Sequence, residues 1–172
     1  MNDKTLYLLR HGAAAAATGG GDAERPLTSD GEAHLGRLAR FLAGQSVRWD
    51  LALCSSALRA RATLEALADV SPKAEIAVDE RLYMATADGA LGLIRQVPEE
   101  VSSLLVVGHN PGLRELGLLA AMPGGAHYQR LGRDLPAGGL LSMVVTAATW
   151  SGLGPRSAYL DGFTMPADVM DV

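Results

Sequence analysis

The sequence is organised around Leu6-Tyr7-Leu8-Leu9-Arg10-His11-Gly12, an apolar run that ends abruptly in an arginine, a histidine and a glycine. A short apolar run bounded by glycine is typical of a buried strand. Side chains at the end of such a strand lie at the edge of the sheet, where open α/β folds place their ligands. Arg10 suits phosphate or carboxylate oxygens, a neutral His11 can act as a nucleophile, and Gly12 allows a sharp turn. Two solvated polar residues at a strand end would give the same pattern, so this stretch alone leaves both readings open.

Length and composition set the broad class of the protein. The 172 residues, with 48% hydrophobic and 20% charged, are typical of one globular domain, which we expect to span residues 1–172. A net charge of −4 and only two lysines argue against a nucleic-acid partner or a polybasic membrane contact. The single cysteine, Cys54, excludes an internal disulfide and favours a reducing compartment. We see no signal peptide and no membrane-spanning run, so we expect a cytoplasmic protein.

Apolar strands alternate with helical patterns along the rest of the chain. This alternation predicts an α/β fold, a three-layer α/β/α sandwich with a mainly parallel, roughly six-stranded sheet. Ser29 and Glu32 fit a capping box at the start of a helix that ends at Gly44. Glycine-rich residues 13–24 and 122–139 read as loops. Strands are expected at 6–9, 50–54, 74–78, 103–107, 140–146 and 158–163, and further helices at 58–68, 87–97 and 113–121.

A second polar motif repeats the first, because Gly108-His109-Asn110-Pro111-Gly112 follows the strand at 103–107. The turn after the strand at 50–54 carries Ser55, and Arg59 lies one turn into the next helix. In a parallel sheet these strand ends meet at one edge, so two arginines and two histidines should surround one pocket. Such a pocket suits a doubly charged phosphoryl group. No carboxylate cluster accompanies the histidines, which argues against a metal site, and no Gly-Lys-Ser/Thr motif is present for a P-loop.

Three blocks of the chain resemble a known family. Leu9-Arg10-His11-Gly12 looks like the signature of the histidine phosphatase superfamily, which includes phosphoglycerate mutase. The stretch Cys54-Ser55-Ser56-Ala57-Leu58-Arg59-Ala60-Arg61-Ala62-Thr63 resembles the second block of that family, and Val107-Gly108-His109-Asn110 resembles the third. The short length, Arg25-Pro26-Leu27-Thr28 and Val107-Gly108-His109-Asn110-Pro111-Gly112 look most like the small SixA-type phosphohistidine phosphatase branch. The resemblance implies a phosphoglycerate mutase-like fold.

The resemblance also implies roles for particular residues. His11 would be the nucleophile and become transiently phosphorylated, while Arg10, Arg59 and His109 would hold the phosphoryl oxygens. Gly12 and Asn110 would complete the substrate-binding residues, and a phosphate or sulfate ion could occupy the same site. Neither a cofactor nor a metal is expected. Because His11 must be neutral with one ring nitrogen free, its other nitrogen should donate to a backbone carbonyl near Gly12.

The general acid and the substrate are the open points of this interpretation. Glu80 is our candidate acid, and Asp22 and Asp79 are weaker ones; Ala13 stands where the small branch often has an acidic residue directly after Arg-His-Gly. A chain this short leaves little room for insertions over a small metabolite, which favours phosphohistidine on a protein. The alternatives are a phosphatase for a small phosphorylated metabolite, a mutase, and a module that binds phosphohistidine without turning it over.

Overall fold

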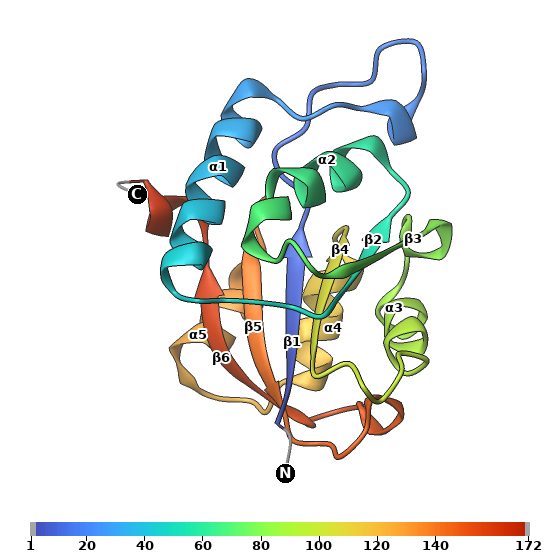
Figure 1. Cartoon of the computed structure of the whole chain (residues 1–172), viewed down its shortest axis with the longest axis vertical. Coiled ribbons are helices and arrows are strands. Elements are labelled where there is room, and N and C mark those ends of the chain that lie inside the picture. The colour runs from blue at the N-terminus through green and yellow to red at the C-terminus, as the bar shows by residue number, and fades with distance from the viewer. Residues whose placement is uncertain (1–2, 171–172) are drawn as a thin grey trace.

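A six-stranded sheet with the strand order β3-β2-β4-β1-β5-β6 forms the centre of the protein in the computed structural model, which describes residues 3–170 (Figure 1). The first four strands in this order are mutually parallel, and β5 runs antiparallel to both β1 and β6. The expected mainly parallel, six-stranded sheet is therefore confirmed. The strands are β1 (Lys4–Arg10), β2 (Leu51–Ser55), β3 (Glu75–Asp79), β4 (Ser103–Gly108), β5 (Leu140–Val145) and β6 (Ala158–Thr164).

Helices cover both faces of the sheet and make the three layers. Figure 1 shows α1 and α2 in front of the sheet and α4 and α5 behind it. Two apolar cores fill the spaces between the layers, one with Leu35 and Leu38 of α1, the other with Leu113 and Leu116 of α4. Within residues 3–170 no helix has the length and apolar character needed to cross a membrane. The helices are α1 (Ser29–Gly44), α2 (Leu58–Ala66), α3 (Ala87–Ile94), α4 (Gly112–Ala120) and α5 (Gly125–Arg133), with short 3-10 turns η1 (Asp22–Glu24), η2 (Ala68–Val70), η3 (Glu80–Leu82), η4 (Trp150–Gly152) and η5 (Pro166–Val169).

Pairing between β1 and β4 brings the two histidine motifs together. The strands are parallel and in register, with Leu9 beside Val107 and Arg10 beside Gly108. Both strands are buried on both faces, which explains why their sequences are continuous apolar runs rather than alternating ones. The chain leaves the sheet at the same level in both strands, so the residues that follow them reach the same edge.

Two local expectations were wrong. Residues 122–139 contain α5, whose Leu131 is fully buried and whose Tyr128 packs against the same core. Glycines near its start hid this helix, because tertiary packing stabilises it despite poor intrinsic propensity. The cap of α1 is Thr28 rather than Ser29, since the Thr28 side chain accepts a hydrogen bond from the Gly31 N–H.

Candidate active site

A cavity of about 410 Å³ opens where β1 and β4 end, and it collects the polar residues of both motifs. Three arginines and two histidines line it, so its walls carry an excess of positive charge. Its two histidines directly follow β1 and β4, and Arg59 lies in the first turn of α2. The lining residues are Arg10, His11, Ala14, Asp22, Arg25, Arg59, Met84, His109, Asn110 and Ala137.

His11 is held as a neutral base with one nitrogen facing the cavity. Its Nδ1 lies 2.8 Å from the carbonyl oxygen of Gly12 and donates to it, and the Nε–H of Arg59 donates to its Nε2 over 3.2 Å. An Nε2 that accepts a hydrogen bond carries no proton, so its lone pair can attack once the Arg59 N–H has turned away from it. Burial, aided by the positive charges of Arg59, Arg10 and Arg25, lowers the pKa of His11 to about 4, although the hydrogen bond to the Gly12 carbonyl acts in the opposite direction.

Gly12 serves the site through close packing rather than through an unusual turn. Its φ is not in the left-handed region, which corrects the expectation of a sharp glycine turn. A Cβ at this position would lie 2.9 Å from Cδ1 of the buried Leu35, so α1 leaves no room for a side chain. The Gly12 N–H donates to Oγ1 of Thr63 over 2.9 Å, and that hydroxyl donates to the Arg59 carbonyl over 2.7 Å. This chain of bonds ties the end of β1 to α2.

Arg59 is the most heavily used side chain of the cavity. It is only 4% exposed, and besides the Nε–H on His11 its Nη1 donates to the Asp22 carbonyl oxygen over 2.7 Å. Its Nη2 lies 3.1 Å from Oδ2 of Asp22 and 3.4 Å from Nδ1 of His109. Arg61, two residues along α2, is exposed and donates to the carbonyl oxygen of Ser56, in line with a solvent-facing side chain.

His109 stands beside His11 with the two ring centres 5.1 Å apart. Burial lowers its pKa to about 4, with further lowering from the neighbouring His11 and Arg59. Its Nε2 lies 2.7 Å from Oγ of the fully buried Ser55, and the Ala57 N–H donates to that same oxygen over 3.3 Å. The Ser55 hydroxyl can therefore donate a hydrogen bond to Nε2. His109 is then the tautomer whose proton lies on Nδ1, the nitrogen on the Arg59 side.

Arg10 and Asn110 approach the cavity as a pair. Both donate to the carbonyl oxygen of Leu135, Arg10 through Nη1 over 3.0 Å and Asn110 through Nδ2 over 2.8 Å. The Nε of Arg10 and the Oδ1 of Asn110 are buried and have no hydrogen-bond partner in the structure. Buried polar atoms without partners are rare in native proteins, and a bound ligand or a water is a common explanation.

Two residues that sequence reasoning did not assign to the site contact it: Arg25 lines the cavity, and Tyr83 lies against Asp22 and His109. Arg25 donates through Nε to the Ala15 carbonyl oxygen over 2.7 Å and through Nη1 to Oδ1 of Asp22 over 3.2 Å. The Tyr83 hydroxyl donates to Oδ2 of Asp22 over 2.5 Å, and its ring meets His109 edge-on at 5.6 Å. The motif Arg25-Pro26-Leu27-Thr28 was a sequence signal for Arg25, whereas nothing local pointed to Tyr83.

Comparison with known proteins settles the family. The sequence model of the histidine phosphatase superfamily (branch 1) matches residues 6–83. The solved structure assigned as phosphohistidine phosphatase SixA in Nakamurella multipartitia is 31% identical, has a TM-score of 0.84, and is aligned over 95% of this chain and 96% of its own. The chain belongs to the histidine phosphatase superfamily. Phosphohistidine phosphatase SixA of Escherichia coli K12 is 35% identical over 111 residues, which are 62% of this chain and 67% of its own length.

Superfamily membership together with the similarity to SixA proteins identifies the protein as a phosphatase of the SixA-type branch. A structure of the protein histidine phosphatase SixA complexed with tungstate is 25% identical, with a TM-score of 0.76 over 95% of this chain and 98% of its own. The resemblance drawn from Leu9-Arg10-His11-Gly12 and the two later blocks is thus confirmed, as is the phosphoglycerate mutase-like fold.

Among the described residues, a single carboxylate side chain lines the cavity of this histidine phosphatase. Asp22 lines the cavity, whereas Glu80 begins η3 as an exposed residue outside the lining. Asp79 is engaged by Arg81, whose Nη2 lies 2.7 Å from its Oδ2. Ala13 also lies outside the cavity lining. Within residues 3–170 no group of three or more His, Cys, Asp or Glu side chains is placed to hold a metal ion.

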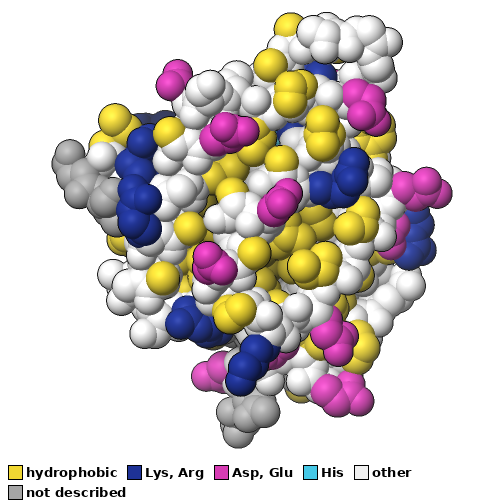
Figure 2. Space-filling view, turned by 45° about the horizontal axis from the view of Figure 1, so that its top comes forward, with side chains coloured by type: hydrophobic (Ala, Val, Ile, Leu, Met, Phe, Trp, Pro, Cys, Tyr) yellow, Lys and Arg dark blue, Asp and Glu magenta, His cyan; other side chains and the backbone are white. Residues whose placement is uncertain are grey.

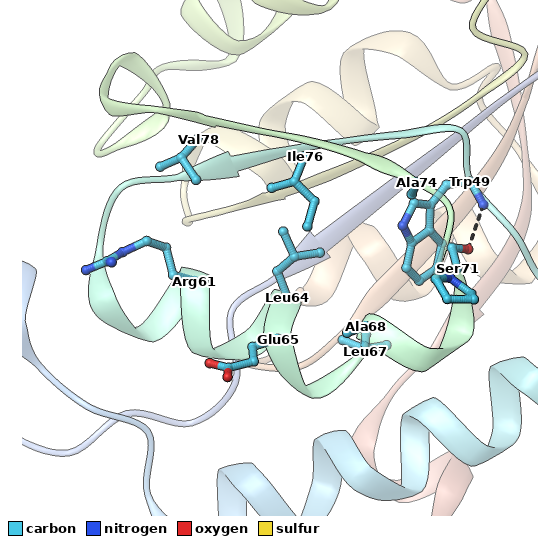
Figure 3. Close-up of a pocket in the computed structure, with 11 residues that line it drawn as sticks. Trp49, Arg61, Leu64, Glu65, Leu67, Ala68, Ser71, Ala74, Ile76 and Val78 are labelled. Carbon is cyan, nitrogen blue, oxygen red and sulfur yellow. Dashed lines mark hydrogen bonds between the residues drawn. The ribbon is translucent and has the colours of Figure 1, made fainter.

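An apolar groove of about 300 Å³ lies between α2 and β3, away from the two histidines (Figure 3). Figure 3 shows Ile76 of β3 facing Leu64 of α2, Val78 farther along β3 on the side of Arg61, and Trp49 at the other end. Figure 2 shows hydrophobic side chains gathered in a hollow on the face of the molecule that carries α1 and α2. The groove has no histidine and one basic side chain, Arg61, so it lacks the donors that a phosphoryl group requires.

Proposed function

We propose that this SixA-type phosphatase removes the phosphoryl group from phosphohistidine side chains of another protein, through a covalent intermediate on His11 and without a metal ion. The observation that carries the proposal is the orientation of His11. Its Nδ1 is engaged by the Gly12 carbonyl, and its Nε2 lone pair faces a cavity with three arginines. A ligand-binding module gains nothing from a neutral nucleophile in such surroundings.

The first step transfers the phosphoryl group to His11. The Nε2 lone pair forms a bond to phosphorus while the bond between phosphorus and the substrate imidazole breaks. The electron pair of that bond goes to the leaving nitrogen, and the departing imidazole is neutral when its other ring nitrogen carries a proton. The Nε–H of Arg59, which donates to Nε2 in the free enzyme, becomes free to donate to a phosphoryl oxygen.

The surrounding donors stabilise the negative charge on the phosphoryl oxygens. Arg59 and Arg10 both line the cavity and supply guanidinium N–H groups, and the unpartnered Nε of Arg10 is one of them. Nδ1–H of His109, in the tautomer that Ser55 supports, supplies another. Donors fixed before the reaction need no reorganisation during it, and such preorganised charge usually lowers the barrier more than any other single effect. These fixed positive charges can replace the charge that a metal ion would bring.

The second step returns the enzyme to its starting state. A water oxygen bonds to phosphorus, the bond to Nε2 of His11 breaks, and the electron pair of that bond returns to the imidazole. The proton of the attacking water passes to solvent water, and inorganic phosphate leaves. The Gly12 carbonyl keeps the proton on Nδ1 throughout, so the ring is in the same tautomer for the next cycle.

The proton supply of the cavity favours an imidazole leaving group. Departure of an alcohol needs a general acid, usually a carboxylic acid. The Tyr83 hydroxyl, followed by Arg25 and Arg59, keeps the pKa of Asp22 well below its usual range, so this carboxylate is ionised and donates no proton. An imidazole takes a proton near neutral pH by itself, because its pKa is about 6.5. A role for Glu80 as the acid for alcohol esters stays a prediction.

Two experiments test the proposal. Rapid quenching with a ³²P-phosphohistidine peptide should trap acid-labile, base-stable label on the wild-type protein and none on His11→Ala; wild-type turnover by that variant would refute the nucleophile. A turnover panel of phosphohistidine peptide, p-nitrophenyl phosphate and sugar phosphates then tests the substrate. We expect Glu80→Gln to retain most activity on the peptide. A wild-type preference for sugar phosphates that Glu80→Gln abolishes would instead establish a metabolite phosphatase, and binding without turnover would establish a recognition module.

A further inference from the structure

A carboxylate of the protein itself lies among the donors of the phosphoryl cavity. Oδ2 of Asp22 accepts from Nη2 of Arg59 over 3.1 Å and from the Tyr83 hydroxyl over 2.5 Å, and Oδ1 accepts from Nη1 of Arg25 over 3.2 Å. Two of the cavity's three arginines are thus bound to one carboxylate. The side chain remains 45% exposed, so water can reach it.

Asp22 and the phosphoryl group need the same N–H groups. Arg59 has five N–H bonds, and in this state one is directed at His11, one at the Asp22 carbonyl and one at the Asp22 carboxylate. Three of its five N–H bonds are therefore engaged before any ligand binds. A phosphoryl group on Nε2 of His11 can take the Nη2–H that now binds Asp22 only after the Asp22 carboxylate has moved away.

The chain around Asp22 allows this movement. Gly19, Gly20 and Gly21 precede it, and Gly19 and Gly21 have φ values of 69° and 82° with no atom within 4 Å of an added Cβ. The base of the loop is fixed by hydrogen bonds from the Ala15 N–H to the Pro26 carbonyl, 2.8 Å long, and from Arg25 to the Ala15 carbonyl. The loop tip that carries Asp22 can therefore shift while its base stays in place.

We infer that Asp22 is a built-in competitor for the phosphoryl site, and that ligands bind only if they attract the arginines more strongly than this carboxylate does. A ligand shifts such an equilibrium only by its difference in affinity for the two states. A singly charged carboxylate ligand offers Arg25 and Arg59 the same group that Asp22 offers and gains nothing. A dianionic phosphoryl group brings a second charge and more oxygens, and it also reaches Arg10. Asp22 is accordingly a specificity-determining residue for the phosphatase reaction proposed above, on which this inference rests.

The test measures anion binding by titration calorimetry, with tungstate and inorganic phosphate as probes and without turnover. We expect Asp22→Asn and Asp22→Ala to bind tungstate roughly ten-fold more tightly, the factor for a site that is competent in about one molecule in ten. Tyr83→Phe, which leaves the carboxylate but removes one of its anchors, should tighten binding by a smaller factor. Glu24→Gln removes an equal charge from η1 without a contact to the arginines, so it should change binding by less than about two-fold. Acetate should compete with tungstate in Asp22→Ala and not in the wild type.

Each outcome decides between the competitor and another role for Asp22. Unchanged tungstate affinity in both Asp22 variants overturns the inference, and weaker binding overturns it by showing that Asp22 positions Arg59 for the ligand. An equal gain in Glu24→Gln overturns it too, because net charge alone would then explain the effect. Circular dichroism and thermal melting verify that the variants fold. Turnover of the phosphohistidine peptide by the wild type is measured in parallel. If the wild type turns over the peptide but the Asp22 variants bind tungstate with unchanged affinity, only the competitor role of Asp22 is refuted. If the variants bind tungstate more tightly but the wild type does not turn over the peptide, only the proposed function is refuted.

Discussion

The ionisation of His11 should set the acid limit of this phosphatase about 2.5 pH units below that of an ordinary histidine. Burial and three arginines lower the pKa of His11 to about 4, against about 6.5 for a free side chain. The active form is the neutral one, so activity should rise with pH through about 4 and level off well below neutrality. At pH 5.5 about 97% of His11 would be neutral with the lowered pKa and about 9% with the ordinary value, roughly a ten-fold difference in active enzyme.

Ring ¹⁵N NMR of the free enzyme measures this ionisation directly, without interference from the ionisation of the substrate. The Nε2 resonance of His11 should show an unprotonated nitrogen at pH 5.5, and Nδ1 a protonated one, as the bond to Gly12 requires. Arg25→Gln removes one of the charges that lower the pKa, so it should move the midpoint upward. A midpoint near 6.5, or an unprotonated Nδ1 at pH 5.5, would refute the argument from burial and charge.

Three further changes test other parts of the site. Arg59→Ala should lower kcat/KM by about 100-fold or more, as for other transition-state donors, while the solvent-facing Arg61→Ala should remain close to wild type; equal small losses would exclude a phosphoryl contact. Gly12→Ala should lower the free energy of unfolding, measured with urea, by about 1–3 kcal/mol through overpacking against α1, whereas Gly92→Ala, where a Cβ meets nothing within 4 Å, should not lower it. Overnight chelation should leave turnover unchanged, and activity restored by a divalent ion would point to a metallophosphatase.

Sequence reasoning found the parts of the site that are tied to strand ends. His11 and His109 directly follow apolar runs, and parallel pairing of two such strands brings their ends to one edge. Arg59 was found because α2 begins immediately after β2, which leaves few possible positions for its side chain. Here local pattern and topology give the same answer, so little tertiary information is needed.

The missed residues depend on contacts between distant segments. Tyr83 meets Asp22 across 61 residues, and no period or cap in either segment encodes that contact. The position of Glu80 after the third strand favours it over Asp22 as the general acid. The 3-10 turn η3, however, leaves Glu80 exposed and outside the cavity. His34 carries no functional signal in the sequence, but its Nε2 lies 3.2 Å from the carbonyl oxygen of Gly138, whose N–H donates to the carbonyls of both Arg10 and His11. The cytoplasmic location stays a prediction.

The burial of Arg59 gives a physical reason for a carboxylate in the cavity. A guanidinium that is only 4% exposed needs a counter-charge, because an unpaired buried charge is strongly destabilising. Asp22 supplies it in the free enzyme, and the phosphoryl group supplies it in the complex. Asp22→Asn should therefore melt at a lower temperature than the wild type without ligand and regain stability with saturating tungstate. A purely structural ion pair would lose stability and ligand affinity together, and that result would show that Asp22 serves only to hold Arg59 in place.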